Sequence, residues 1–326
     1  MKTSSEAPPG SVPALQRHTL NGETMGTRYS AVFFAPTNIN LGAIGTALFA
    51  AVDQVDRQMS TWKPDSDLNR LNAAPAHQWH AVPAELLAVL DAAVRVGIQS
   101  RGAFDIGVGE LVNAWGFGPT GQQPQAQQIR VLGQRTQRAA SAVLEVDLVH
   151  QRVRKQEAIA LDLSGIAKGY GVDAMAHCLD GFGITCYLVG IDGEMRAKGT
   201  KPGGQAWAVA IEKPVRHVRE VMGVMELIDA AIATSGDYRH WVKVADKHFA
   251  HTMDPRSGRP VDNRIASVTV VMPTCMLADA WATALLVMGA PAATELAQQR
   301  GMTALIVVRA GEVFEEISIV DGQLQP

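Results

Sequence analysis

Hydrophobic residues recur at helical spacing in two segments of the first half of the chain. Between residues 41 and 59 they fall three or four apart, which predicts an amphipathic helix capped by Asn40. The positions are Leu41, Ile44, Leu48, Val52, Val55 and Met59. Pro83 suits the first turn of a second helix. Its predicted core positions are Leu86, Leu87, Leu90, Val94 and Ile98, and residues 28–34 read as a strand.

The second half of the chain is richer in short strands. Its β-prone apolar runs are bounded by turn residues and cover 184–191, 206–212, 224–234, 265–272, 303–309 and 312–319. Helices are predicted at 165–180, 276–288 and 291–300. Because strands mostly follow strands, with helices inserted, the pattern predicts an α+β fold rather than a doubly wound α/β sheet. No internal repeat is evident in the sequence.

The amino-acid composition argues against some classes of protein. The 326 residues carry a formal net charge of −3 and only 19% charged side chains, without a stripe of lysine or arginine, which argues against nucleic-acid binding through bulk charge. No apolar run approaches the length of a membrane span. Residues 1–17 are predicted to be a flexible tether because Ser, Pro and Gly are frequent there, and residues 18–326 are predicted to be the folded part.

A carboxylate and a hydroxyl lie four residues apart in the most apolar helical segment, 276–289. On a helix this spacing places Asp279 and Thr283 on one face, one above the other. One carboxylate and one neutral oxygen are half of a hard-cation site, since Mg²⁺ takes few protein oxygens and leaves its other positions to phosphate and water. The alternative is structural: Asp279 acts as a cap, and Thr283 bonds back to its own helix.

A glycine-flanked helix start at residues 162–171 is a candidate anion site. Free backbone N–H groups and the helix dipole would hold an anion there, assisted by Lys168. The segment lacks the GxxxxGK[ST] spacing of a Walker A loop. A tight turn with a solvated lysine explains the segment equally well.

Three further loops are dense in polar residues. The Asp192-Gly193 pair follows a hydrophobic strand, where loops often hold ligands, although Asp-Gly by itself mostly signals a turn. Residues 232–239 also run from a strand into a polar turn, and Ser235 lacks both a G-x-S-x-G elbow and a local base, so a ligand-contacting loop is favoured over a nucleophile. Residues 251–260 combine a histidine, a carboxylate and two arginines in a rigid Asp-Pro turn, which a solvated surface turn would also explain.

Together these segments resemble the ApbE-like family of FAD:protein FMN transferases. The matching motifs follow one another in order from Glu23 to Gly289. They are Glu23–Thr27, Met59–Asn72, Phe104–Ile106, Leu111–Phe117, Asp162–Gly171, Ala233–Tyr238, His251–Pro260 and Ala278–Ala284. Each motif is weak alone, and the ordered set is specific.

The resemblance implies a fold and two sets of ligand-binding residues. The fold would be two closely packed α/β parts similar to a duplicated tunnelling-fold unit, formed by residues 18–326 as one domain, with FAD in the cleft between the parts. Mg²⁺ would be held by Asp279, Thr283 and the backbone carbonyl of Ala167. The implied FAD-binding residues are Met25, Trp62, Asp105, Trp115, Gly116, Phe117, Lys168, Asp192, Gly193, Thr234, Ser235 and Gly236.

Some positions depart from the family pattern. Trp62 stands where the family commonly has Tyr, which preserves a flat ring for stacking. Glu110 replaces a frequent Pro. Asp192 and Glu194 stand where Gly and Asp are usual, and Asp192 places a side chain where a ligand would approach the backbone. These departures bear on local cofactor contacts rather than on the family.

The activity implied by the resemblance is transfer of FMN from FAD to a Thr or Ser hydroxyl of another flavoprotein, with release of AMP. His251 is the candidate general base, because imidazole titrates near neutral pH, and Asp254 and Asp237 are candidate orienting groups. One alternative is hydrolysis of FAD to FMN and AMP, and another is a non-catalytic FAD-binding or delivery protein. A flavin oxidoreductase is disfavoured because no nicotinamide fingerprint follows a strand.

The resemblance also leads to expectations about the protein's partner and its cellular compartment. The chain has no [ST]-G-A-[ST] run of the kind that substrates of the family carry, so we expect it to modify a partner flavoprotein rather than itself. If a leader was removed, the tether suits a periplasmic protein held peripherally at the membrane. If the chain is complete as written, it works in the cytoplasm.

Overall fold

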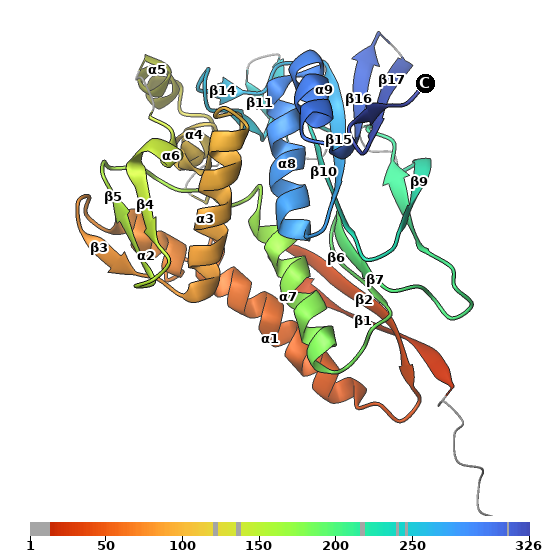
Figure 1. Cartoon of the computed structure of the whole chain (residues 1–326). Helices are drawn as coiled ribbons and strands as arrows, with labels where there is room; N and C mark the ends of the chain where they lie inside the picture. Colours follow the sequence, from red (N-terminus) through yellow and green to blue (C-terminus); the bar gives the residue numbers. More distant parts are fainter. Residues whose placement is uncertain are drawn as a thin grey trace, which may run out of the picture.

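A nine-stranded antiparallel sheet organises the computed structural model, which describes residues 14–119, 123–134, 138–215, 219–238, 241–244, 247–311 and 313–326 (Figure 1). In sheet order its strands are β1 (Leu15–Thr24), β2 (Thr27–Pro36), β6 (Tyr187–Ile191), β7 (Glu194–Lys198), β10 (Ala231–Gly236), β15 (Ile265–Met272), β16 (Thr303–Ala310), β17 (Val313–Val320) and β18 (Gln323–Leu324). Every neighbouring pair is antiparallel. The predicted α+β class is therefore confirmed.

The same order of elements occurs twice along the chain. Four helices accompany the sheet: α1 (Leu41–Met59), α7 (Ala167–Gly181), α8 (Cys275–Met288) and α9 (Ala290–Gln299). The first unit runs β1-β2-α1-α7-β6-β7, and the second runs β10-β15-α8-α9-β16-β17. Long insertions separate α1 from α7 and β10 from β15. The two units join where β7 pairs with β10, through only Ala231↔Arg196 and Ile232↔Met195.

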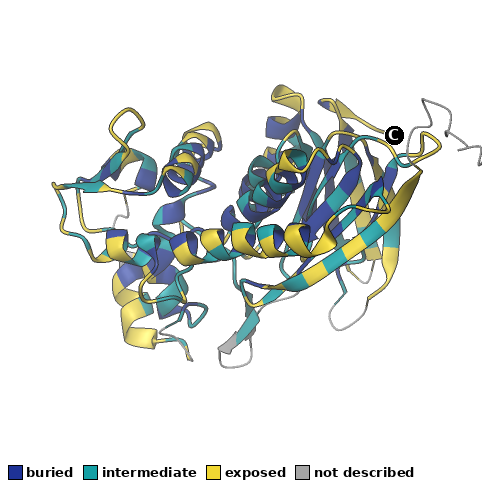
Figure 2. Ribbon diagram, turned by 90° about the horizontal axis from the view of Figure 1, so that it is seen from below, coloured by how far each residue is buried: buried dark blue, intermediate teal, exposed yellow. Residues whose placement is uncertain are grey.

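Alternation along the strands gives the sheet two buried faces. Ala31 and Phe33 of β2 pack with α1 and α7, whereas the intervening Val32 and Phe34 pack under a separate hairpin. This hairpin consists of β8 (Trp207–Glu212) and β9 (Val221–Leu227), and Trp207 anchors it to the sheet. Buried residues accordingly gather between the layers, and exposed ones lie on the outside (Figure 2).

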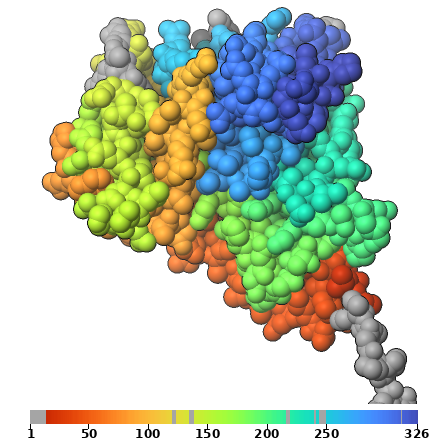
Figure 3. Space-filling view, viewed as in Figure 1, coloured from red at the N-terminus to blue at the C-terminus, as the bar shows by residue number. Residues whose placement is uncertain are grey.

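The insertion between α1 and α7 forms a flanking part. Its elements are α2 (Asp67–Ala73), β3 (Trp79–Ala81), α3 (Ala84–Gln99), the 3₁₀ turn η1 (Ile106–Val108), α4 (Gly109–Ala114), α5 (Ala126–Gln134), α6 (Ala140–Val143), β4 (Leu144–Asp147) and β5 (Arg152–Lys155). On the face shown in Figure 3, α3 lies as a column between the β4–β5 region and helices α8 and α9. The second insertion contains β11 (Trp241–Val244), β12 (Lys247–Ala250), β13 (Met253–Asp254) and β14 (Arg259–Pro260).

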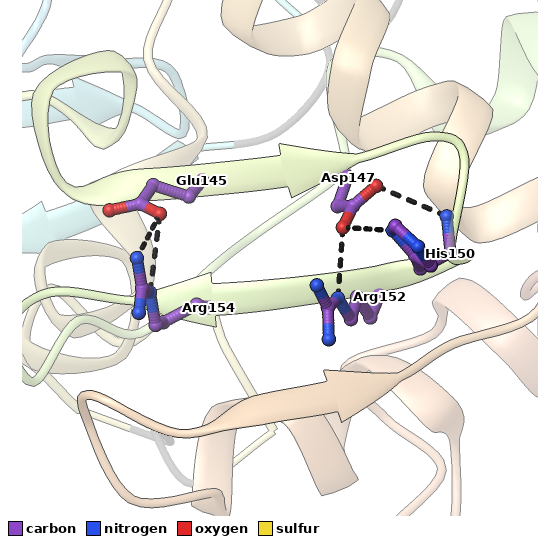
Figure 4. Close-up of polar contacts among 5 residues, drawn as sticks. All are labelled: Glu145, Asp147, His150, Arg152 and Arg154. Carbon is purple, nitrogen blue, oxygen red and sulfur yellow. Dashed lines mark hydrogen bonds and ion pairs between the residues drawn. The ribbon is translucent and has the colours of Figure 1, made fainter.

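A charge ladder covers the exposed face of the β3-β5-β4 sheet (Figure 4). Its members are Glu145, Asp147, His150, Arg152 and Arg154. Arg154 Nη2 donates to Glu145 Oε2 at 2.6 Å, and Arg152 Nε donates to Asp147 Oδ2 at 2.9 Å. The backbone N–H of His150, followed by the Arg152 and His150 side chains, lowers the pKa of Asp147 to about 2. Every charge of the ladder therefore has a partner.

Most sequence-based elements are confirmed, with three corrections. Ile98 of α3 and Leu41 of α1, predicted to face the core, are 62% and 37% exposed because they lie at the ends of their helices. The side chain of Asn40 accepts from Ala43 N and caps α1 as predicted. The run 224–234 is two strands, because the chain turns through Asp229 at φ +48°. The predicted tether, 1–17, overlaps β1, whose first residue Leu15 pairs with Pro36. Residues 1–13 of that tether lie outside the described residues. Among the described helices, none has the length and apolar character needed to cross a bilayer.

Candidate functional site

A cleft of about 1140 Å³ lies where both units and both insertions meet. It collects residues far apart in the sequence, from the β1–β2 turn to α8. The predicted site residues on its wall are Met25, Trp62, Asp105, Gly116, Phe117, Lys168, Asp192, Gly193, Thr234, Ser235, Gly236, His251, Asp279 and Thr283. The volume is at the upper end of the range for small-molecule sites, as a dinucleotide-sized ligand requires.

The floor of the cleft is built by α7 and α8 in close contact. A Cβ added at Gly169 would lie 2.4 Å from the carbonyl oxygen of Cys275, so only glycine lets the two backbones approach this closely. The buried carboxylate of Asp173 on α7 accepts the N–H groups of Cys275 and Met276 at 3.0 and 2.9 Å. Asp173 thus caps the start of α8 from a neighbouring helix, which fixes the position of Asp279 one turn later.

Asp279 and Thr283 share one face of α8, as their spacing predicts. The Asp279 carboxylate is 3% exposed and accepts the N–H of Gly169 at 3.1 Å. The Thr283 hydroxyl lies 3.0 Å from the hydroxyl of Ser235, at the end of β10. Burial, and then the charge of Glu194, raise the pKa of Asp279 to about 7. An ionised carboxylate is therefore disfavoured here unless a cation compensates it.

A lysine and a second buried carboxylate complete this cluster. Lys168 Nζ donates to Glu194 Oε1 at 2.7 Å. Burial alone would lower the pKa of Lys168, but the neighbouring carboxylates raise it above its usual value. Burial also raises the pKa of Glu194 despite the lysine. The other oxygen of Glu194, Oε2, is buried and has no hydrogen-bond partner among the described residues. We refer to Lys168, Glu194 and Asp279 as the cleft cluster.

The donor set fits a hard cation better than a transition metal. Within the described residues, no group of three or more His, Cys, Asp or Glu side chains is arranged to hold a metal. The available donors are instead one buried carboxylate, Asp279, and neutral oxygens such as the Thr283 hydroxyl. Ala167, whose carbonyl is the third predicted donor, is the first residue of α7 and lies two residues before Gly169. Oxygen donors with few charges match the preferences of Mg²⁺.

Aromatic side chains surround the remainder of the cleft. Trp62 follows α1 and is 64% exposed, which is unusual for tryptophan. Phe117 follows α4, and its ring centroid lies 6.4 Å from that of His251, edge to face. A flat, partly apolar ligand would cover these rings when bound.

Four predicted site residues do not line the cleft, and Ala167, the predicted carbonyl donor to Mg²⁺, is one of them. Trp115 is 6% exposed and packs against Phe249, with 5.1 Å between ring centroids, so it belongs to a small core instead. Both oxygens of Asp237 are occupied by Arg309, at 2.6 and 2.7 Å. Asp254 accepts the backbone N–H and the side-chain Nε of Arg256 within its own turn. Asp237 and Asp254 each have an arginine partner, and the orienting roles assigned to them from the sequence stay predictions.

Asp105 and Asp192 line the cleft with additional backbone constraints. The Asp105 carboxylate accepts the N–H groups of Gly107 and Ala140, and burial raises its pKa. The Asp105 carboxylate is thus held mainly by backbone N–H groups of the chain. Asp192 has φ +52°, a left-handed conformation that aspartate tolerates better than most residues. A residue other than glycine thus adopts at this turn a backbone conformation that is easiest for glycine.

Several wall residues were not predicted from the sequence. They are Glu194, Glu212, Arg219, Tyr238 and Trp241. Glu194 was singled out only as a departure from the family pattern. Glu212 and Arg219 flank the loop between β8 and β9, and local polarity gives no indication that this hairpin reaches the cleft.

Comparison with known proteins identifies the family of this chain. The sequence profile of the ApbE family matches residues 25–306. An FAD:protein FMN transferase of Vibrio cholerae is 38% identical over 93% of this chain and 91% of its own, and that of Escherichia coli K12 is 32% identical over 94% and 88%.

Solved structures give the same result. The flavin transferase ApbE of Vibrio cholerae aligns with a TM-score of 0.83 at 35% identity, over 94% of this chain and 97% of its own. The apo flavinyl transferase ApbE of Pseudomonas stutzeri aligns with the same TM-score at 33% identity, over 94% and 96%. This chain belongs to the ApbE family.

Proposed function

We propose that this chain transfers the FMN part of FAD to a Thr or Ser hydroxyl of a partner flavoprotein, with AMP as the leaving group and Mg²⁺ as the cofactor. The hydroxyl oxygen forms a bond to the FMN-side phosphorus, the bond from that phosphorus to the AMP oxygen breaks, and the hydroxyl proton goes to a base. The observation that carries the proposal is the cleft cluster beside the Ser235–Thr283 hydroxyl pair.

The chain's own residues divide into binding and proton-transfer roles. Trp62, exposed at the rim, would stack on the isoalloxazine ring. Lys168 brings a partly buried positive charge to the floor, where a pyrophosphate would be stabilised. Asp279, Thr283 and the carbonyl of Ala167 would hold Mg²⁺. When bound, Mg²⁺ neutralises pyrophosphate charge as a Lewis acid.

His251 is the proposed acceptor of the hydroxyl proton. It lines the same cleft as Asp279, and Phe117 contacts its ring edge to face. An imidazole is suited to this step because its ordinary pKa is close to neutral pH. Asp237 and Asp254 would act only through other groups, because Arg309 binds both carboxylate oxygens of Asp237 and Arg256 binds Oδ1 of Asp254.

The test is a direct labelling experiment. The protein is incubated with FAD and MgCl₂, with or without a peptide containing Ser/Thr-Gly-Ala-Ser/Thr, and flavin fluorescence on the peptide is followed after denaturing electrophoresis. We expect labelling that EDTA abolishes, with one AMP released for each FMN attached. FMN and AMP without labelled peptide would support FAD hydrolysis instead. An unchanged FAD pool would support a binding or delivery protein.

A further inference from the structure

A second, smaller hollow of about 550 Å³ adjoins the cleft. Its wall consists of the β1–β2 turn and one side of α1. The lining residues are Glu23, Thr24, Met25, Gly26, Thr27, Arg28, Phe49, Asp53 and Asp56. Met25, Gly26 and Thr27 also line the cleft, so the turn is the border that the two hollows share.

The border is a tight two-residue turn with a fixed conformation. Thr24 pairs with Thr27, and the two residues between them have positive φ, +47° for Met25 and +71° for Gly26. This is the signature of a type I′ hairpin turn. A methionine in the left-handed region costs roughly 1 kcal/mol, so the surrounding structure must hold it there. The Met25 side chain does contact the core: a Cβ added at Gly171 would lie 3.2 Å from Met25 Cε.

The opposite wall presents an unusual exposed ring. Phe49, Asp53 and Asp56 are spaced i, i+4 and i+7, which places them on one face of α1. Phe49 is 51% exposed, whereas the apolar stripe of α1 is buried. Lys63 pairs with Asp56 at 2.7 Å and with Asp53 at 3.8 Å.

The charges around the hollow offer nothing that favours a phosphate-bearing occupant. Arg57 and Lys63, which lie outside the lining, bind the carboxylates of Asp53 and Asp56. Glu23 and Arg28 add one charge of each sign, so these residues give AMP or the pyrophosphate of FAD no excess positive charge to bind. An exposed phenyl ring beside charges of both signs suits an extended polypeptide, which brings an apolar side chain for the ring and polar groups for the rim.

We propose that this hollow binds the acceptor protein, specifically the segment next to the modified residue. The segment crosses the Met25–Gly26 turn and places its Ser or Thr hydroxyl in the cleft. The inference rests on the proposed function, since it assigns the surface that recognises the protein substrate of that reaction. Phe49 is the specificity-determining contact and takes no part in the chemistry.

The test separates peptide recognition from FAD binding. Phe49→Ala is compared with Phe182→Ala, a matched control because Phe182 is 40% exposed just after α7 and lines neither hollow. With the Ser/Thr-Gly-Ala-Ser/Thr peptide as probe, we expect Phe49→Ala to raise the KM for peptide roughly tenfold. Its kcat at saturating peptide and its Kd for FAD should match those of Phe182→Ala.

Any other outcome contradicts either the docking proposal or the proposed function. An unchanged peptide KM in Phe49→Ala, with the unaltered protein labelling the peptide normally, overturns the docking proposal alone. A raised Kd for FAD in Phe49→Ala means that FAD occupies the hollow, and also overturns it. No labelling by the unaltered protein overturns the proposed function, and the docking proposal with it.

Discussion

The charge ladder and the cleft cluster are built from the same kinds of side chain and behave in opposite ways. In the ladder, Arg154 and Glu145 have side chains 32% and 41% exposed, and the pKa of Asp147 is lowered to about 2. In the cleft, Glu194 is 4% exposed and burial raises the pKa of Asp279 to about 7. In the ladder, hydrogen-bond and ion-pair partners set the direction of the carboxylate pKa shift. In the cleft, loss of hydration on burial sets it.

The difference shows how to separate structural from functional charges in this protein. The ladder is complete as it stands, because each acid has a base beside it in water. The cleft cluster has two buried carboxylates and one lysine, and in the part of the chain that the structure describes Glu194 Oε2 has no hydrogen-bond partner. Such an arrangement is unfavourable for the protein alone and becomes favourable when a ligand or cation supplies the missing charge.

Removing the carboxylate from each region should give the largest contrast. We expect Asp279→Ala to lower the rate of FMN transfer on the order of 1,000-fold, because Lewis-acid stabilisation of the pyrophosphate is worth several kcal/mol. Asp147→Ala should leave the rate unchanged. Peptide labelling at saturating FAD and MgCl₂ measures both, with thermal unfolding as the check on folding. Full activity of Asp279→Ala in EDTA would exclude the metal site.

The two histidines allow a second comparison. His251→Ala should reduce kcat roughly 100-fold while the Kd for FAD stays the same, since general-base catalysis contributes about this much. His150→Ala, in the ladder, should change neither quantity. Single-turnover labelling and FAD titration give the two numbers. If His251→Ala loses FAD affinity and rate by the same factor, the histidine binds the cofactor and is not the base.

Double-mutant cycles on the Glu145–Arg154 and Glu194–Lys168 ion pairs should give different coupling energies, although this effect is smaller than the effects on rate. Unfolding of Glu145→Gln, Arg154→Met and the double variant is expected to give only a small coupling energy, because both side chains are largely in water. Glu194→Gln, Lys168→Met and their double variant should give roughly 2 kcal/mol, because Lys168→Met leaves the buried carboxylate of Glu194, 4% exposed, without its lysine. Equal coupling in both cycles would remove the distinction between the regions.

The smallest predicted effect is the pH dependence of the free energy of unfolding that Asp147 of the ladder contributes. The folded pKa of Asp147 is about 2, below the ordinary value of 3.8 for an aspartate, so its ionisation stabilises the fold. This contribution is complete above about pH 4 and is lost as pH falls through about 2. Urea midpoints of the unaltered protein and Asp147→Asn should therefore converge over that window. Parallel curves would show that the carboxylate is not held by its partners in solution.

The sequence identifies local elements well and long-range symmetry poorly. Asn40 and the stripe from Ile44 to Met59 specify α1 because caps and periodicity are local signals. The duplicated β-β-α-α-β-β order is invisible in the sequence, because the first unit is interrupted between α1 and α7 and the second between β10 and β15. The edge strand β1 was partly missed because most of its side chains are exposed, which removes the apolar alternation.

For the site, the spacing of Asp279 and Thr283 already placed them on one face of a helix. Which polar loop residues face inward depends on partners elsewhere in the chain. Asp237 was expected in the cleft, and Arg309, 72 residues later, binds its carboxylate instead. Trp115 lies beside two cleft residues, yet its own ring turns into the core against Phe249. Tertiary contacts of this kind leave no local signature.

The contact between α7 and α8 at Gly169 has a consequence for turnover. With no side chain between the two backbones, and with Asp173 holding the start of α8, these helices move as a single body. Ligand exchange must then come from the walls, through the exposed Trp62 segment and the loops around His251. We expect substitutions in the wall region to alter the rate of AMP release rather than the rate of bond formation. The floor would keep the same geometry from one cycle to the next.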